Sequence, residues 1–403
     1  MRGRSVRLAV GGMAVAALAV PLLAVTPSAA SATTTPSNTL TLAVYGDAPY
    51  GTTPTDTAEF NATPAFIDSV NADPDVSAVV HVGDIHSGKQ YCTAAYDQSI
   101  YNMWTRFTDP LIYTPGDNEW TDCHKAGEGG GTYNSGTGQI NYVTDSTGQP
   151  VDYAGGDPIA NLNLVRSLFF ADPGRTLGQK SMPVQSQAQL NDPSHPDDAT
   201  FVENVMWERR GIVFVTLNLP GGSNDDADVW YGAPTASPAQ TQERAQRDGA
   251  DLRWLDRAFG VAQADGARGV VVIEQADMWD LDGKAPAHLS NYDPFVRSLA
   301  DHTSAFGRPV LLLNGDSHSF RSDNPLSATA PCFTEDTTVT TCSEWSNHKQ
   351  SDGSGFNVAN FHRITVHGST FPLEWLKLSV SDNGHLPAGA SSFGPFSWQR
   401  MPQ

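Results

Sequence analysis

Four Gly-Asp pairs, each at the end of an extended apolar run, constrain this chain more than any other feature of its sequence. The runs are LTLAVYGD to Asp47, SAVVHVGD to Asp84, LIYTPGD to Asp117 and VLLLNGD to Asp316. Buried strands that end in this way bring their tips together at one edge of a sheet, where the carboxylates converge. Carboxylates held so close raise one another's pKa unless a cation lies among them. The sequence therefore predicts a cation site.

The N-terminal residues differ from the rest and are set aside from the fold. Three arginines precede an apolar stretch over 8–25, and Ala-Ser-Ala at 30–32 offers a cleavage site. We interpret 1–32 as a secretory signal peptide and 33–38 as a linker, with a membrane anchor as the alternative. We then expect a secreted protein, free of the membrane after cleavage, with a single domain over 39–403.

Charge limits the partners of the chain. The formal net charge is −20, and it becomes more negative when the leader, which contains three arginines, is removed. Nucleic acid and anionic lipid both require a positive surface, so we expect neither as a partner. An anionic substrate would be attracted by bound metal instead.

Four cysteines remain after the leader, in an oxidising environment if the protein is exported. Cys332 and Cys342 are close in sequence and are expected to form one disulfide, which leaves Cys92 and Cys123 for the other. Four cysteines allow three pairings, and a thiolate metal site is the competing interpretation, although no Cys-x-x-Cys spacing supports it.

Strands and helices are expected to alternate along the chain. Strands are expected at 40–45, 78–82, 204–209, 211–217, 269–273 and 309–313, and helices at about 64–70, 96–107, 162–170, 240–262 and 294–306. Alternation with continuous apolar strands predicts an α/β fold whose sheet is covered on both faces. HRITVHG and WLKLSV are expected to be closing antiparallel strands. The glycine-rich stretch at about 125–160 is expected to be a surface insertion near the site.

The order and spacing of the motifs resemble the calcineurin-like metallophosphoesterase superfamily over nearly the whole mature chain. The segments that carry the resemblance are GDAPY, GDIHSG, PGDNEW, VVVIEQAD and NGDSHSF. That family is a four-layer αββα sandwich of two mixed sheets, and it hydrolyses phosphate esters with a metal-bound hydroxide at a binuclear site. The resemblance implies the same fold and activity here.

The metal ligands implied by the resemblance differ from the family pattern in a consistent direction. Asp47, Asp84 and His318 match family ligands, while Asp117, Gln275 and Asp316 stand where the family has Asn, His and His. The histidine of the first motif falls at Pro49, which cannot ligate. Oxygen donors therefore prevail, which favours two divalent or mixed-valence ions of Mn, Mg, Fe or Ca over Zn.

Further roles follow from the same resemblance. Asn118 replaces the family's histidine that protonates the leaving group, and His86 and His124 in nearby loops are candidate replacements, with solvated loop histidines as the alternative. Tyr50 is expected to line the substrate pocket, with a ferric-iron ligand as the alternative. Arg321 could hold a phosphate oxygen, or pair with Asp323 instead.

Lys89 and Lys125 are weaker candidates for the phosphate contact, and His81 is expected in the core by strand alternation. Two functions therefore stay open. One is a secreted metal-dependent phosphoesterase acting on a small phosphorylated substrate, and the other is a non-catalytic metal- or ligand-binding protein on the same fold. The carboxylates at two lost positions favour the first, and the missing histidines favour the second.

Overall fold

The computed structural model describes residues 39–402 except 52, 54, 226–227, 282–284, 334–337, 340–341, 343–344, 371 and 382–388. Asn38–Gln403 forms one compact unit. The expected leader and linker lie outside the described residues. No helix in the part of the chain described here is both long and apolar enough to cross a membrane.

One sheet has six strands in the order β16-β17-β15-β1-β2-β3. Its strands are β1 (Thr39–Tyr45), β2 (Val76–His81), β3 (Leu111–Tyr113), β15 (Glu374–Ser381), β16 (Ser391–Phe393) and β17 (Phe396–Pro402). β1, β2 and β3 run parallel, while β15 and β17 continue the sheet in antiparallel pairing. The parallel strands need crossovers, which are the helices α1 (Ala58–Ala72) and α2 (Ala94–Trp104).

The second sheet has seven strands in the order β11-β14-β10-β9-β8-β7-β6. These are β6 (Gln185–Ser186), β7 (Val205–Arg209), β8 (Ile212–Thr216), β9 (Gly269–Ile273), β10 (Val310–Asn314), β11 (Arg321–Asp323) and β14 (Phe361–Thr365). The strands β8, β9, β10 and β14 are parallel, and the edge strands are antiparallel.

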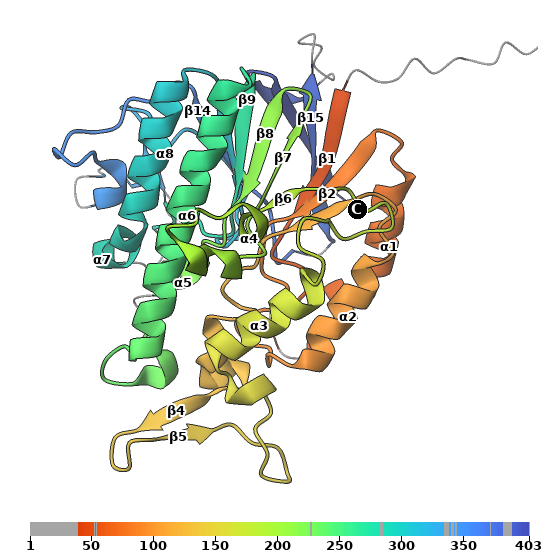
Figure 1. The fold of residues 1–403 in the computed structure, drawn as a ribbon. Coiled ribbons are helices and arrows are strands. Elements are labelled where there is room, and N and C mark those ends of the chain that lie inside the picture. Colours follow the sequence, from red (N-terminus) through yellow and green to blue (C-terminus); the bar gives the residue numbers. More distant parts are fainter. Residues whose placement is uncertain are drawn as a thin grey trace, which may run out of the picture. The chain divides into compact units, whose positions relative to one another are not determined.

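Alternate side chains of each strand enter different cores, and this places the layers. Leu42 and Val44 of β1 pack against Val271 and Ile273 of β9 between the two sheets. The outer face of the six-stranded sheet packs against α1, α2 and α3 (Pro158–Phe169). The outer face of the other packs against α6 (Pro238–Ala264) and α8 (Asp293–Phe306). The expected four-layer αββα sandwich of two mixed sheets is therefore confirmed (Figure 1).

Short elements fill the connections. They are β4 (Gly131–Asn134), β5 (Gln139–Tyr142), β12 (Cys332–Phe333), β13 (Thr338–Val339), α4 (Gln187–Leu190), α5 (Gly221–Asn224) and α7 (Pro286–Leu289). Three-residue 3-10 turns include η1 (Asp122–His124), η2 (Ala126–Glu128), η3 (Tyr153–Gly155), η5 (Trp230–Gly232), η6 (Ser290–Tyr292) and η7 (Ser346–His348), and η4 (Pro196–Thr200) is longer.

Two expectations need correction, and one hairpin was not predicted. The first helix begins at Ala58 rather than near Pro64, because its first turns are anchored by burial of Glu59 and Thr63. HRIT forms β14, which is parallel to β10 and antiparallel only to β11. The glycine-rich insertion is not irregular throughout, since β4 and β5 pair as an antiparallel hairpin within it.

The cysteine pairing is confirmed. Cys92 bonds to Cys123 and Cys332 to Cys342, with no free cysteine. The first disulfide joins the loops that follow β2 and β3. His81 lies in the core as expected, fully buried, with its Nε2 2.9 Å from the Ala48 carbonyl oxygen.

Candidate metal centre

The carboxyl ends of parallel strands from both sheets meet at one place. Asp47 follows β1, Asp84 follows β2 and Asp117 follows β3, while Asp316 follows β10 of the other sheet. Ligands of α/β proteins bind at such strand ends, where loops leave the sheet. Both sheets contribute because they face each other across a shared core.

Asp47, Asp84 and His318 form the tightest group at this place. One ligand atom from each lies within 4.8 Å of the others. The His318 Nε2 is 3.8 Å from Asp47 Oδ1. Asp47 Oδ1 accepts the Asp316 N–H at 2.9 Å, whereas Asp47 Oδ2 is buried with no hydrogen-bond partner. A buried carboxylate oxygen without a partner is costly unless a cation or water meets it.

Gln275 holds two of the carboxylates in place. Its Nε2 donates to Asp84 Oδ2 at 3.1 Å and to Asp117 Oδ1 at 2.9 Å, and its Oε1 accepts the Gly221 N–H. The amide nitrogen therefore faces the carboxylates, and this differs from the expectation that Gln275 is a metal ligand. A nitrogen that carries two hydrogens offers no lone pair to a metal.

Asp117 and Asp316 approach each other across Gly221. A Cβ atom built on Gly221 would lie 2.6 Å from Asp316 Oδ1 and 3.0 Å from Asp117 Oδ2. The other oxygen of Asp316 accepts the Asp277 N–H at 3.1 Å. The site therefore has room for these two carboxylates only because residue 221 has no side chain.

Four of these residues adopt left-handed backbone conformations. The φ angles of Asp47, Asp84, Asp316 and His318 are 48°, 58°, 73° and 60°. Side chains rarely adopt positive φ, although Asp, Asn and His tolerate it better than most. Such conformations gather where a functional constraint holds them. At this site they turn each side chain sharply off the end of its strand.

The electrostatics of the group are those expected of cation ligands. Burial raises the pKa of Asp84 well above its usual range, and neighbouring carboxylates, Asp117 foremost, raise it further. Burial raises the pKa of Asp47 in the same way. In the described part of the chain, no Lys or Arg forms an ion pair with either residue. A group of carboxylate oxygens with one imidazole fits Mn, Mg, Ca or Fe ions.

Asn118 and Glu119 support the carboxylates from the loop after β3. Asn118 is half-buried, and its Nδ2 donates to Asp84 Oδ2 at 3.1 Å. Glu119, which sequence reasoning missed, is buried and accepts from the Gly116 N–H at 2.7 Å and the Ile85 N–H at 3.3 Å. It therefore ties together the two loops that carry Asp84 and Asp117. An acid directly after the GDN of this motif was the available signal.

Tyr50 lies beside the group rather than in the open. Its hydroxyl is 3.1 Å from His318 Nε2, and its side chain is almost fully buried. The tyrosine is therefore placed to orient the imidazole, in addition to the pocket-lining role expected from the sequence.

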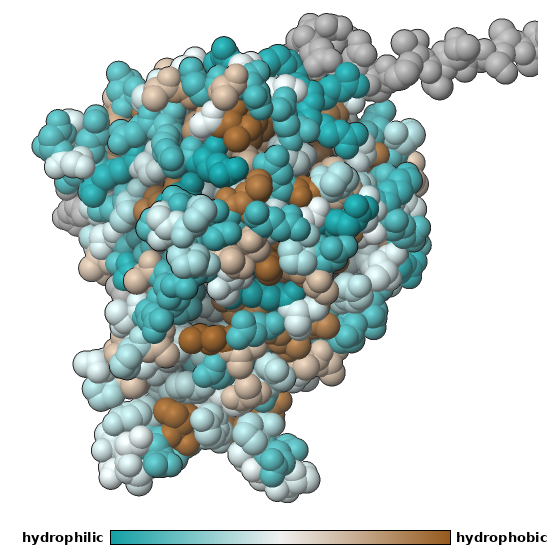
Figure 2. Space-filling view, viewed as in Figure 1, coloured by the Kyte–Doolittle hydropathy of each residue, from teal (hydrophilic) through white to brown (hydrophobic). Residues whose placement is uncertain are grey.

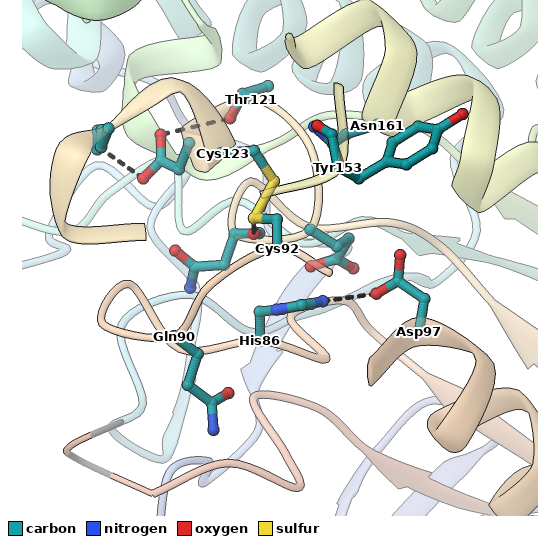
Figure 3. The surroundings of a disulfide bond; sticks show 12 residues. His86, Gln90, Cys92, Asp97, Thr121, Cys123, Tyr153 and Asn161 are labelled. Carbon is teal, nitrogen blue, oxygen red and sulfur yellow. Dashed lines mark hydrogen bonds and ion pairs between the residues drawn. A yellow bond between two sulfur atoms is a disulfide. The ribbon is translucent and has the colours of Figure 1, made fainter. Parts of the chain in front are cut away.

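The two candidate acid histidines are buried, and their hydrogen bonds go to groups other than these carboxylates. His86 Nε2 hydrogen bonds to Asp97 Oδ1 at 2.6 Å beneath the Cys92–Cys123 disulfide (Figure 3). His124 Nδ1 accepts the Tyr231 N–H at 3.0 Å, and burial lowers the pKa of His124 to about 4. Neither ring forms a hydrogen bond to Asp84 or Asp117 among the described residues. A neutral, buried His124 is a poor proton donor near neutral pH.

The candidate phosphate contacts are less tightly placed. Arg321 begins β11 and lines a small polar recess with Ser317, which adjoins His318 in the chain. Lys89 is exposed, and Lys125 is paired with Asp122 at 2.5 Å and with Asp228 at 2.9 Å. Two further groups with metal-ligand geometry, around Cys92 and around Cys332, contain cysteines already used in disulfides.

The chain was compared with family models, curated proteins and solved structures. No family model matches the chain, and no curated protein matches its sequence. Among solved structures it is similar to a purple acid phosphatase isolated from yellow lupin (Lupinus luteus) seeds, at 11% identity and a TM-score of 0.42. The match covers 90% of this chain and 51% of that one, so this chain spans about half the length of that phosphatase. We therefore base the function on the geometry of the site alone.

Proposed function

We propose that this protein is a secreted, metal-dependent hydrolase of phosphate esters. The observation that carries the proposal is the convergence of Asp47, Asp84 and His318, with a buried oxygen of Asp47 lacking any partner. Buried carboxylates without a protein cation favour an external one.

Five side chains supply the ligands. Asp47, Asp84 and His318 would hold one ion, and Asp84, Asp117 and Asp316 surround the place for a second. When bound, such ions activate water for attack on phosphorus and offset charge on the phosphoryl oxygens. Gln275 and Glu119 would keep the carboxylates aligned through the hydrogen bonds described above.

The chain's own polar groups would orient the substrate. Asn118 lies half-buried beside Asp84 and can donate an amide hydrogen to a phosphoryl oxygen if it leaves its bond to Asp84. Tyr50 would hold His318 in place through the contact of its hydroxyl with Nε2. Arg321, in the adjoining recess, is the nearest candidate to grip a second oxygen of the ester.

Protonation of the leaving group is the weak point of the site. Asn118 cannot donate a proton, His124 is neutral near pH 7, and the Nε2 of His86 is hydrogen bonded to Asp97. Esters whose leaving groups need no protonation, such as aryl phosphates, should therefore be cleaved far faster than alkyl ones. Equal rates on both classes would show that a proton donor acts.

Secretion and a small substrate complete the proposal. Two disulfides favour an oxidising compartment, and the net charge of −20 disfavours a polyanionic substrate such as nucleic acid. We therefore infer a small phosphorylated molecule as the substrate.

The second candidate is a non-catalytic protein that binds metal or ligand at the same place. It is favoured by one observation: among the described residues, His124 is buried with a pKa lowered to about 4, and His86 hydrogen bonds to Asp97 instead of to Asp84. The two candidates share the ligands and differ only in turnover.

Metal content and turnover separate them. The purified mature protein, never exposed to chelator, would be analysed by elemental mass spectrometry and assayed with an aryl phosphate monoester and the matching diester. Asp84→Asn is the test variant, since asparagine tolerates the left-handed backbone there and keeps the size of the side chain. Asp68→Asn, on the exposed face of α1, is the matched control.

We expect about two ions per chain and hydrolysis that Asp84→Asn reduces by at least about 10³-fold, with Asp68→Asn unchanged. Bound metal without turnover on either ester, after supply of Mn, Mg or Fe, would select the binding protein. Absence of both metal and turnover would reject the site itself.

A further inference from the structure

Three tyrosines stand out on the surface. Tyr91, Tyr142 and Tyr153 are 44%, 44% and 40% exposed, and no other large hydrophobic side chain of the described residues is as open to solvent. All three belong to the glycine-rich insertion or to the loop beside it. We call these three residues the tyrosine patch.

Backbone contacts keep the patch together. The Tyr153 N–H donates to the carbonyl of Cys92, the residue after Tyr91, at 2.9 Å. Gly155 leaves space for Tyr142, since a Cβ atom there would lie 2.7 Å from the Tyr142 ring. Tyr231 packs edge-on against Tyr142 with ring centroids 6.1 Å apart, and its hydroxyl donates to the Gly155 carbonyl at 3.2 Å. These contacts therefore hold the backbone that carries the rings.

The hairpin beside the rings is polar without charge, up to the exposed Asp145 that follows it. Residues 129–144, GGGTYNSGTGQINYVT, contain no Asp, Glu, Lys or Arg, in a chain with a net charge of −20. Their side chains offer hydroxyl and amide groups, which both donate and accept hydrogen bonds. Tyrosine with Ser, Gly and Asn is also the composition of surfaces built for recognition.

The hairpin stands clear of the sandwich. Figure 1 shows β4 and β5 projecting beyond α2 and α3, away from both sheets. Figure 2 shows this end of the molecule in paler colours than much of the face above it. In Figure 3 the Tyr153 ring extends away from the disulfide at the base of the insertion.

We propose that the tyrosine patch, with the uncharged hairpin beside it, is a docking surface for a neutral carbohydrate chain. The C–H faces of sugar rings stack on exposed aromatic rings, while the tyrosine hydroxyls stay hydrated. The hydroxyl and amide groups of 129–144 complement sugar hydroxyls. The absence of charge along residues 129–144 matches a polymer that is itself uncharged.

Other partners fit this surface less well. A protein interface buries an apolar centre, and the patch has no exposed Leu, Ile, Phe, Met or Trp beside it among the described residues. A polyanion or an anionic membrane would be repelled by the net charge. A polycation would be drawn to the acidic remainder of the surface rather than to its uncharged part.

The surface is connected to the candidate metal centre. Both sulfurs of the Cys92–Cys123 disulfide lie near the Asn118 carbonyl oxygen, at 3.3 and 3.7 Å. A carbohydrate chain on the patch would therefore lie on the Asn118 side of the site. The binding itself is independent of the proposed hydrolysis and is tested without it.

Affinity electrophoresis in native gels tests the proposal directly. The gels would contain a soluble neutral β-glucan, amylose or a galactomannan, with anionic alginate and cationic chitosan as charged references. The test variant carries Tyr91→Ser, Tyr142→Ser and Tyr153→Ser together, and the matched control carries Phe at the same three positions. Thermal melting by circular dichroism checks that both variants are folded at the temperature of the gels.

We expect at least one neutral polymer to retard the protein and its Phe variant, with Kd raised at least about tenfold in the Ser variant. Equal retardation of the protein and the Ser variant would overturn the proposal. So would failure of every neutral polymer, or retardation by alginate or chitosan alone. Self-association lost in the Ser variant, without binding to any neutral polymer, would assign the patch to a second copy instead.

Discussion

Two groups of aspartates lie side by side in this protein, and their negative charges are compensated differently. Asp277 pairs with the buried Arg363 at 2.6 Å, and Arg363 also pairs with Asp323 at 2.8 Å. Asp47 and Asp84, a short distance away across Asp316, pair with no Lys or Arg of the described residues. Asp277 therefore has a cationic partner within the chain, whereas Asp47 and Asp84 have none among the described Lys and Arg residues.

The difference separates carboxylates that an arginine of the chain neutralises from those that we propose bind metal. A buried charge is tolerated when a partner and hydrogen bonds satisfy it, and breaking such a pair is strongly destabilising. Burial raises the pKa of a carboxylate that has no partner, unless an external cation binds it. Asp277 links the groups, because its N–H donates to Asp316 while its carboxylate is held by Arg363.

Removing the arginine should have the largest effect. We expect Arg363→Met to lower the free energy of unfolding by about 3–5 kcal/mol, because Asp277 is left buried and unpaired. Urea denaturation in chelator measures this. Arg106→Met, which breaks the exposed pair with Asp68, is the control and should cost at most about 1 kcal/mol. An equally small loss of unfolding free energy in both variants would show that Asp277 does not depend on Arg363.

Added metal ion should stabilise the protein through Asp47 and Asp84, which have no cationic partner among the described Lys and Arg residues. Mn²⁺ at about 100 times its Kd is expected to raise the free energy of unfolding by about 2.7 kcal/mol. Thermal or urea unfolding with and without the ion would show it. Asp84→Asn should abolish this gain while Arg106→Met keeps it. An equal gain in Asp84→Asn would place the ion elsewhere.

Neutralising one carboxylate should have a smaller effect, visible through pH. Since the pKa of Asp47 is raised on folding, its contribution to stability is full at low pH and is lost as pH rises above about 4. In chelator, Asp47→Asn should therefore gain stability over the parent protein as the pH rises from 5 to 8, by at most about 1.4 kcal/mol per pH unit. Asparagine keeps the left-handed backbone and the bond from Asp316. Parallel pH profiles would contradict the account.

Much of the fold followed from local sequence pattern. Apolar runs predicted β1, β2, β8, β9 and β10, because a strand buried on both faces needs continuous apolar residues. The Gly-Asp ends predicted which residues meet, since neighbouring parallel strands end at the same edge. The direction of β14 did not follow, because the sequence does not reveal how the long connection after β10 returns to the sheet.

Parts of the site depend on contacts that no local pattern records. Gln275 was expected to ligate, yet the Gly221 N–H fixes its amide oxygen and turns the nitrogen inward. The burial of His86 against Asp97 depends on where α2 packs, which the loop sequence does not show. The hairpin of β4 and β5 was missed because its strands are short, glycine-rich and weakly alternating.

The left-handed turns at Asp47, Asp84, Asp316 and His318 limit how such a site can change over time. A β-branched residue is strained at these positions whatever its charge, while Asn, Asp, His and Gly are admissible. The residue types tolerated at these four positions are therefore few, and most of them carry oxygen or nitrogen donor atoms. Under the proposed function, single substitutions within this set would change the donor atoms offered to the metal, and few would replace them with hydrocarbon.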